Sequence, residues 1–112
     1  MTVEEIIAEL SLTVVVGDKL AQPVSGGYVS DLLSNVMGQA GSGNIWVTMQ
    51  GHQNVVAVSL LAGLAAVIIA GGVNPDATTV NKAKAEGVIL LTTELSAFEV
   101  AGQLYKLGIR GS

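Results

Sequence analysis

The sequence contains no cysteine and a single histidine, His52. Without cysteine the chain can form no disulfide, no thiolate metal site and no cysteine nucleophile. One histidine is too few for a metal site built from several imidazole ligands. A catalytic set of nucleophile, base and orienting group would have His52 as its only imidazole base, and no serine stands in a recognisable motif. We therefore expect no metal site, no catalytic residues and no enzymatic activity.

Charged residues are also scarce. They make up 12% of the 112 residues, about half of the usual ~25%, and nine acids against five bases give a net charge of −4. An acidic balance argues against a nucleic-acid partner. Half of the chain is apolar, and a domain of this size has too little interior to bury all of it. The excess predicts a homo-oligomer, with a dimer favoured, or a surface covered by a partner protein.

No Asp, Glu, Lys or Arg occurs between Asp31 and Asp76, and residues 55–73 form an apolar run long enough to span a bilayer. Gly63 interrupts this run, and no Lys or Arg flanks it closely. We therefore expect a helix over 54–61, a turn at 62–63 and a strand over 65–70, with no membrane partner.

The N-terminus carries Glu4, Glu5 and Glu9 where a signal peptide would have a basic region and an apolar core. This start predicts a cytoplasmic protein. No linker, internal repeat or low-complexity tract divides the chain, so residues 1–112 are expected to form one domain.

Helix signals alternate with short apolar runs. Thr2 and Glu5 form a capping-box pattern, and Asn74-Pro75-Asp76 is typical of a helix start. Further helices are expected from about residue 29 to 39, over 54–61, and after Ser96, where Phe98, Ala101, Leu104 and Tyr105 share a face. Strands are expected over 12–16, 44–50, 65–70 and 88–91. The strands are apolar throughout, which predicts a three-layer α/β/α sandwich with a largely parallel or mixed sheet of about four strands.

Ligands of open α/β sheets favour the carboxyl ends of the strands, where helix N-termini point. These ends carry polar residues and glycines but no Lys or Arg, and neither G-x-G-x-x-G nor a P-loop motif is present. We therefore expect no dinucleotide or P-loop site and no cofactor. The candidate ligand-binding residues are Gly26, Gly27, His52, Gln53, Gly71, Gly72, Thr92, Thr93 and Ser96.

Two interpretations are open at each of His52, Asp31 and the pair Gly26-Gly27. His52 could hydrogen-bond a ligand or serve as a turn residue satisfied by backbone. Asp31 could bind a metal, although stabilising the first turn of a helix is the simpler role. The pair Gly26-Gly27 could cradle an anion or form a sharp turn into the following helix.

The segment Ser25-Gly26-Gly27, with the helix over residues 28–34, resembles the DRTGG domain, a small regulatory module named for its Asp-Arg and Thr-Gly-Gly residues. Ser25 stands for the Thr, and Ala21 and Gln22 stand where the Asp-Arg pair would be. The likeness to stand-alone DRTGG proteins extends to three further segments. They are the strand over 44–49, the helix start Asn74-Pro75-Asp76 and residues 92–107.

The resemblance extends to the N-terminal domain of bacterial HPr kinase/phosphorylase, which lacks that enzyme's kinase core. DRTGG domains otherwise occur beside CBS domains and acyl-phosphate-metabolising enzymes, and as small proteins encoded near iron hydrogenase genes. The resemblance implies an α/β/α fold and a non-catalytic regulatory or assembly role. The missing Asp-Arg pair implies that any contact made by those two residues is absent here.

Two functions remain open. One is a non-catalytic regulatory or oligomerisation module that modulates a partner enzyme or assembly, which the low charge and the apolar excess favour. The other is a sensor that binds a neutral or weakly anionic metabolite or nucleotide at the carboxyl ends of the strands, which the polar residues there favour.

Overall fold

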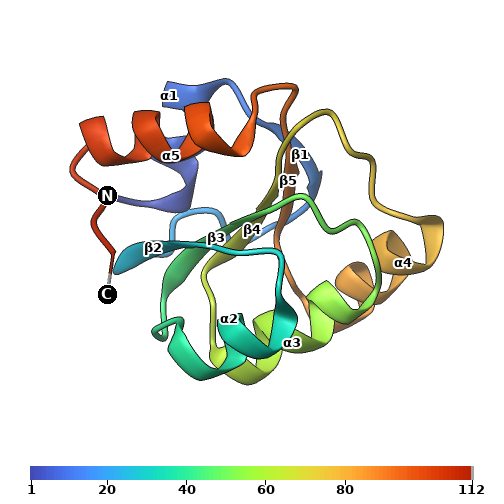
Figure 1. Ribbon diagram of the computed structural model, residues 1–112. Coiled ribbons are helices and arrows are strands. Elements are labelled where there is room, and N and C mark those ends of the chain that lie inside the picture. The colour runs from blue at the N-terminus through green and yellow to red at the C-terminus, as the bar shows by residue number, and fades with distance from the viewer. Residues whose placement is uncertain (112) are drawn as a thin grey trace.

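A computed structural model of the chain describes residues 1–111. Helices and strands alternate from β2 to α5 (Figure 1). The helices are α1 (Val3–Leu10), α2 (Leu33–Gln39), α3 (Asn54–Ala62), α4 (Ala77–Glu86) and α5 (Ala97–Lys106). The strands are β1 (Thr13–Val16), β2 (Gly26–Val29), β3 (Asn44–Thr48), β4 (Ala66–Ile69) and β5 (Leu90–Thr92).

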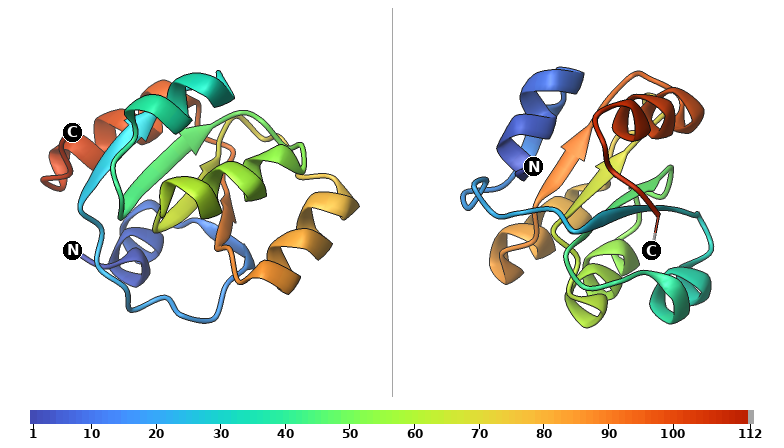
Figure 2. Two further views of the ribbon diagram at one scale, coloured as in Figure 1. Left: turned by 90° about the horizontal axis from the view of Figure 1, so that it is seen from below. Right: turned by 90° about the vertical axis from the view of Figure 1, so that its left-hand side faces the viewer.

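The strands form one sheet in the order β1-β5-β4-β3-β2. Strands β2 to β5 are parallel, and β1 pairs antiparallel with β5. Helices α1 and α5 cover one face of the sheet, and α2, α3 and α4 cover the other (Figure 2). The expected three-layer α/β/α sandwich with a mixed, mostly parallel sheet is confirmed.

The core has two halves, one on each face of the sheet, because β3 and β4 are buried on both sides. Ile45, Val47 and Ile68 face α1 and α5. Trp46 and Val67 face the other three helices. This arrangement explains why these strands read as continuous apolar runs rather than as alternating ones.

The glycine pair lies in a strand, and the expectation of a helix entry there is wrong. Gly26–Val29 form β2 as an edge strand beside β3, so the sheet has five strands rather than about four. The helix expected from residue 29 begins at Leu33. Glycine favours strands poorly, and this strand is held by pairing with residues about 18 positions later, which no local pattern reveals.

Helix starts were predicted with mixed success. The capping box of α1 is present, since the Thr2 hydroxyl accepts from the Glu5 N–H at 3.2 Å and the Glu5 carboxylate accepts from the Thr2 N–H at 2.9 Å. Helix α4, however, has Asp76 rather than Asn74 as its N-cap. The Asp76 N–H donates to the Gly51 carbonyl at 3.0 Å, so a long-range contact fixes where α4 begins.

The long apolar run folds as expected into helix, turn and strand. Helix α3 ends at Gly63, which adopts the left-handed conformation with a φ of 67°, and β4 follows three residues later. Glycine takes this conformation without a Cβ clash, which makes it a common helix terminator. Within residues 1–111, no helix is both long and apolar enough to cross a membrane.

The capping box should make stability depend on pH in the acid range. The pKa of Glu5 lies below its ordinary value of 4.5, chiefly because the Thr2 N–H donates to its carboxylate. A lowered pKa stabilises the fold above the ordinary value, and this contribution is lost as the pH falls through the folded-state pKa. We expect Glu5→Gln to reduce the dependence of the melting temperature on pH in this acid range, as measured by circular dichroism. Identical profiles for both proteins would contradict the role of the charge.

Candidate functional site

The loops at the carboxyl ends of the strands are held together by hydrogen bonds within the protein. The Asp31 carboxylate accepts from the Thr48 hydroxyl and from the Met49 N–H, each at 2.7 Å. We expected Asp31 in the first turn of a helix, and this expectation is wrong, because Asp31 precedes both α2 and its N-cap Leu32. It joins the end of β2 to the end of β3, a role that depends on tertiary pairing.

The amides of Gly71 and Gly72 also have partners. Both glycines adopt positive φ, 74° and 73°, as a ligand-binding turn would require. Their N–H groups, however, donate to the carbonyls of Leu95 at 2.7 Å and Thr93 at 3.0 Å. These bonds join the loop after β4 to the loop after β5, and they occupy the two backbone donors that a ligand at this loop would need.

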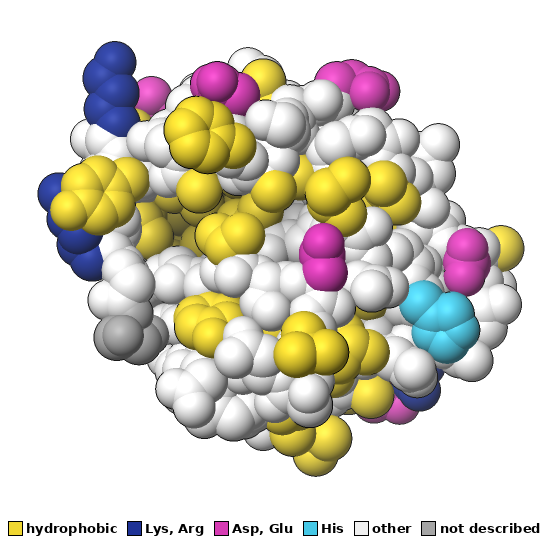
Figure 3. Space-filling view, viewed as in Figure 1, with side chains coloured by type: hydrophobic (Ala, Val, Ile, Leu, Met, Phe, Trp, Pro, Cys, Tyr) yellow, Lys and Arg dark blue, Asp and Glu magenta, His cyan; other side chains and the backbone are white. Residues whose placement is uncertain are grey.

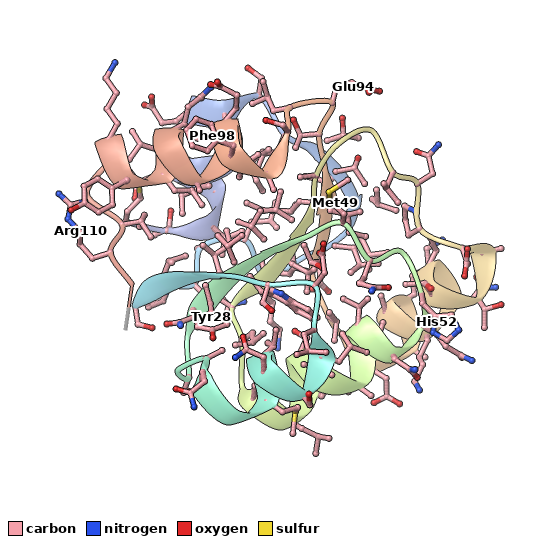
Figure 4. All side chains as sticks on the ribbon, viewed as in Figure 1. Tyr28, Met49, His52, Glu94, Phe98 and Arg110 are labelled. Carbon is pink, nitrogen blue, oxygen red and sulfur yellow. The ribbon has the colours of Figure 1, made fainter. Side chains whose placement is uncertain are left out.

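His52 and Gln53 lie at the start of α3. They do not lie beside the predicted residues in the loop between β5 and α5. His52 is exposed, and its Nδ1 accepts from the Asn54 N–H at 3.3 Å, as a turn residue would. Helices α3 and α5 cover opposite faces of the sheet, and Figure 4 shows His52 beside α3 and Glu94 beside α5, well apart.

The predicted residues around β5 have local structural roles. Thr92 pairs with Thr13 and Ile69 in the sheet. The hydroxyl of Thr93 accepts from the Leu95 N–H at 3.1 Å, and that of Ser96 caps α5 by accepting from the Glu99 N–H at 3.2 Å. The nine predicted site residues are therefore distributed over several places rather than one crevice.

A shallow hollow of about 550 Å³ lies beside the start of α5. Among the predicted site residues it includes only Thr93, and two carboxylates, Glu9 and Glu94, contribute to its wall. Its lining residues are Glu9, Leu10, Ser11, Thr13, Thr93, Glu94, Leu95 and Gln103. No Lys or Arg is among them, so this hollow suits a neutral ligand better than a phosphate.

A second site lies between α5 and the edge strand β2, and sequence reasoning did not find it. It is an apolar groove of about 180 Å³ that contains Gly27 from the predicted set. It is lined by Gly27, Tyr28, Val29, Val47, Ala101, Leu104, Tyr105, Ile109, Arg110 and Gly111. Figure 3 shows a hollow with a hydrophobic floor on this face of the molecule.

The C-terminal segment closes one end of this groove. The Gly27 N–H donates to the Arg110 carbonyl at 2.9 Å, and Gly27 forms a parallel bridge with Gly111. The Arg110 guanidinium stacks on the Tyr105 ring, 3.8 Å from its centroid, and also donates to the Tyr105 carbonyl at 2.6 Å. A Cβ on Gly27 would lie 3.1 Å from Ile109 Cγ2, so glycine lets this segment pack closely.

The apolar face expected on the last helix is divided between core and surface. Leu104 is buried, together with Val100, whereas Phe98 is 84% exposed and Tyr105 is 61% exposed. Tyr105 and Val29, which is 51% exposed, both line the groove, and Phe98 precedes Tyr105 by seven residues on α5. Exposed apolar groups gathered in this way are typical of a contact surface.

The positions that carried the family resemblance lie at the amino ends of the strands. Ser25 donates to the Ser42 carbonyl at 2.8 Å, before β3. Gln22, in the place of the Arg, donates through Nε2 to the Ala65 carbonyl at 2.9 Å, before β4. These two side chains fasten the connection between β1 and β2, a structural role.

Comparison with known proteins supports the resemblance. No curated protein matches the chain. A solved structure with the same fold contains the CBS and DRTGG domains of the regulatory region of Clostridium perfringens pyrophosphatase, complexed with the activator diadenosine tetraphosphate. The TM-score is 0.71 at 14% identity, over 92% of this chain and 45% of that chain, so this protein spans less than half the length of that structure. The DRTGG domain family itself matches residues 5–107. This chain is therefore a member of the DRTGG domain family.

Proposed function

We propose that this chain is a non-catalytic regulatory module that self-associates and thereby modulates a partner enzyme or assembly. The observation that carries the proposal is the exposed aromatic face of α5 beside the groove, with Phe98 and Tyr105 both more than half exposed. Contact between such a face and water is unfavourable. Burying apolar surface in a protein contact stabilises that contact by roughly 25 cal/mol per Å². A protein surface of matching shape would remove it from water.

The size of the groove favours a protein contact over a small ligand. Its volume of about 180 Å³ is below the ~300–1,000 Å³ of typical ligand pockets. The most exposed aromatic ring of this face, Phe98, is not among the residues that line the groove. A flat contact can cover both the groove and the ring, whereas a small molecule inside the groove would leave the ring exposed.

The relationship to a regulatory region supports the regulatory part of the proposal. In the Clostridium perfringens structure, a DRTGG domain accompanies CBS domains within the regulatory region of a pyrophosphatase. A domain of this fold is thus part of a region that controls an enzyme. In the chain described here, the same fold would act on a partner through contacts rather than through chemistry of its own.

Self-association can be tested by substituting the exposed ring. We expect Phe98→Ser to weaken the dimer by about tenfold or more, because aromatic anchors dominate interface energetics. The melting temperature of the isolated chain should change little, since Phe98 is 84% exposed. Sedimentation velocity over a range of concentrations measures the first effect, and circular dichroism the second.

Leu61→Ser is the matched control for this test. Leu61 is 74% exposed on α3, which covers the opposite face of the sheet. This variant should associate like the wild type. A wild-type chain that stays monomeric at all concentrations tested would overturn the self-association part of the proposal.

A ligand sensor is the second candidate, and the hollow beside the start of α5 favours it. A ligand at a hundredfold excess over its Kd stabilises the fold by about 2.7 kcal/mol, which a thermal-shift screen detects. Because Glu9 and Glu94 contribute to this hollow, neutral metabolites should give larger shifts than nucleoside triphosphates or diadenosine tetraphosphate.

Variants separate the two placements of a sensor site. Thr93→Ala should remove the thermal shift if the hollow is the site. Loss of the shift in His52→Ala or Thr92→Ala would instead support the crevice that we expected from the sequence. A polyphosphate giving the largest shift would contradict both placements.

A further inference from the structure

We infer that α5 packs antiparallel against α5 of a second copy, about a two-fold axis that passes between Ala101 and Gly102. The inference rests on the proposed self-association and specifies its surface and register. Three independent features of α5 and its flanks agree on the same axis: the positions of two aromatic rings, the small residues between them, and the charges at either end.

The aromatic rings are placed symmetrically about this axis. Phe98 and Tyr105 are seven residues apart, so each lies about 5 Å along the helix from the midpoint between Ala101 and Gly102. Two turns of a helix bring both rings to nearly the same side. In the antiparallel pair, Phe98 of each copy meets Tyr105 of the partner subunit. Such aromatic pairs contribute beyond the area that they bury.

The centre of the pair contains small residues. Ala101 lines the groove, and a Cβ added at Gly102 would find no heavy atom within 4 Å. The space above this part of α5 is therefore open. Helices with small residues at their contact approach to about 8 Å, close enough for the rings on either side to interdigitate.

The charges at the two ends are complementary in the same register. Glu94 precedes α5 and Arg110 follows it, and Figure 4 shows them at opposite ends of the face that carries Phe98. In residue number they are centred on residue 102, within half a residue of the midpoint of the two rings. The two-fold axis thus brings Glu94 of each copy to Arg110 of the partner subunit, with exposed Lys106 adding positive charge to that end.

The composition of this face suits a specific interface. Two exposed aromatic rings, Val29 and the groove between them supply the apolar centre, and Glu94, Lys106 and Arg110 supply a charged rim. This is the usual anatomy of a specific interface.

The register predicts a specific charge-swap result. Glu94→Arg alone sets arginine against Arg110 of the partner subunit, and Arg110→Glu alone sets glutamate against the partner's Glu94. Each variant alone should dimerise about tenfold more weakly or worse. In an equimolar mixture both contacts are attractive, so the heterodimer should form with nearly the wild-type affinity. Sedimentation velocity with one variant labelled measures the two homodimers and the heterodimer. Circular dichroism confirms that both variants are folded.

Two further variants keep the result unambiguous. Gly102→Gln adds bulk where the isolated chain has open space, so it should raise the melting temperature of the monomer and yet abolish the α5 pair. Lys84→Glu, an exposed reversal on α4, should leave dimerisation unchanged.

The outcomes distinguish the inference from the proposed function. A dimer that tolerates Glu94→Arg, Arg110→Glu and Gly102→Gln overturns the α5 pair and leaves self-association through another face. Weakened homodimers without rescue in the mixture overturn the register. A chain that never dimerises overturns both.

Discussion

Replacing Trp46 with alanine should lower the free energy of unfolding by about 3–5 kcal/mol. Trp46 is fully buried at the centre of β3, and it is the largest buried side chain among the described residues. It packs between the sheet and the helices α2 to α4, and its Nε1 donates to the Ser30 carbonyl at 2.8 Å. The substitution removes that bond and leaves a cavity that rigid strands on either side cannot fill. Urea unfolding followed by circular dichroism measures the loss.

Trp46→Phe is the control that separates packing from hydrogen bonding. It keeps most of the ring volume and removes the donor to Ser30, so it should cost about 1–3 kcal/mol. Equal losses for the phenylalanine and alanine variants would show that the hydrogen bond, rather than the filled volume, dominates at this position.

Gly51→Ala should also destabilise the fold strongly, by about 2–4 kcal/mol. A Cβ on Gly51 would lie 2.9 Å from the Asn74 carbonyl oxygen and 3.2 Å from the Pro75 Cα, both backbone atoms. The Gly51 carbonyl accepts from the Asp76 N–H and, at 2.8 Å, from the Thr79 hydroxyl. Moving the loop to relieve the overlap would therefore break the bonds that fix the start of α4.

The matched control is Gly38→Ala. Gly38 lies in α2, and a Cβ there would meet no heavy atom within 4 Å. Alanine favours a helix over glycine by up to about 1 kcal/mol, so this variant should be slightly more stable than the wild type. If Gly51→Ala proved as stable as Gly38→Ala, the close contact between the loops after β3 and β4 would be refuted.

The sequence predicted those parts of the fold that local chemistry determines. The capping box at Thr2, the turn at Gly63 and the doubly buried strands β3 and β4 follow from residue type and spacing. The strand β2 does not, because two glycines favour no regular structure and only pairing with β3 makes them a strand.

The candidate site was harder to predict for a related reason. Glycines and hydroxyls at the strand ends suggest free donors, but the amides of Gly71 and Gly72 are taken by carbonyls about 22 residues further along the chain. The groove beside β2 depends on the C-terminal segment, which lies next to Gly27 only in the folded chain. A usable signal did exist on α5, where Phe98 and Tyr105 are separated by the small residues Ala101 and Gly102.

The pairing of β1 with β5 has a consequence for synthesis in the cell. Thr13 pairs with Thr92, so the first strand of the chain binds the last strand to be made. At 5–20 residues per second, the roughly 76 residues that follow β1 up to the end of β5 take about 4–15 s to translate. Throughout this interval α1 and β1 lack the partner that completes their side of the core. The nascent chain should therefore depend on ribosome-associated chaperones more than the stability of the finished domain would suggest.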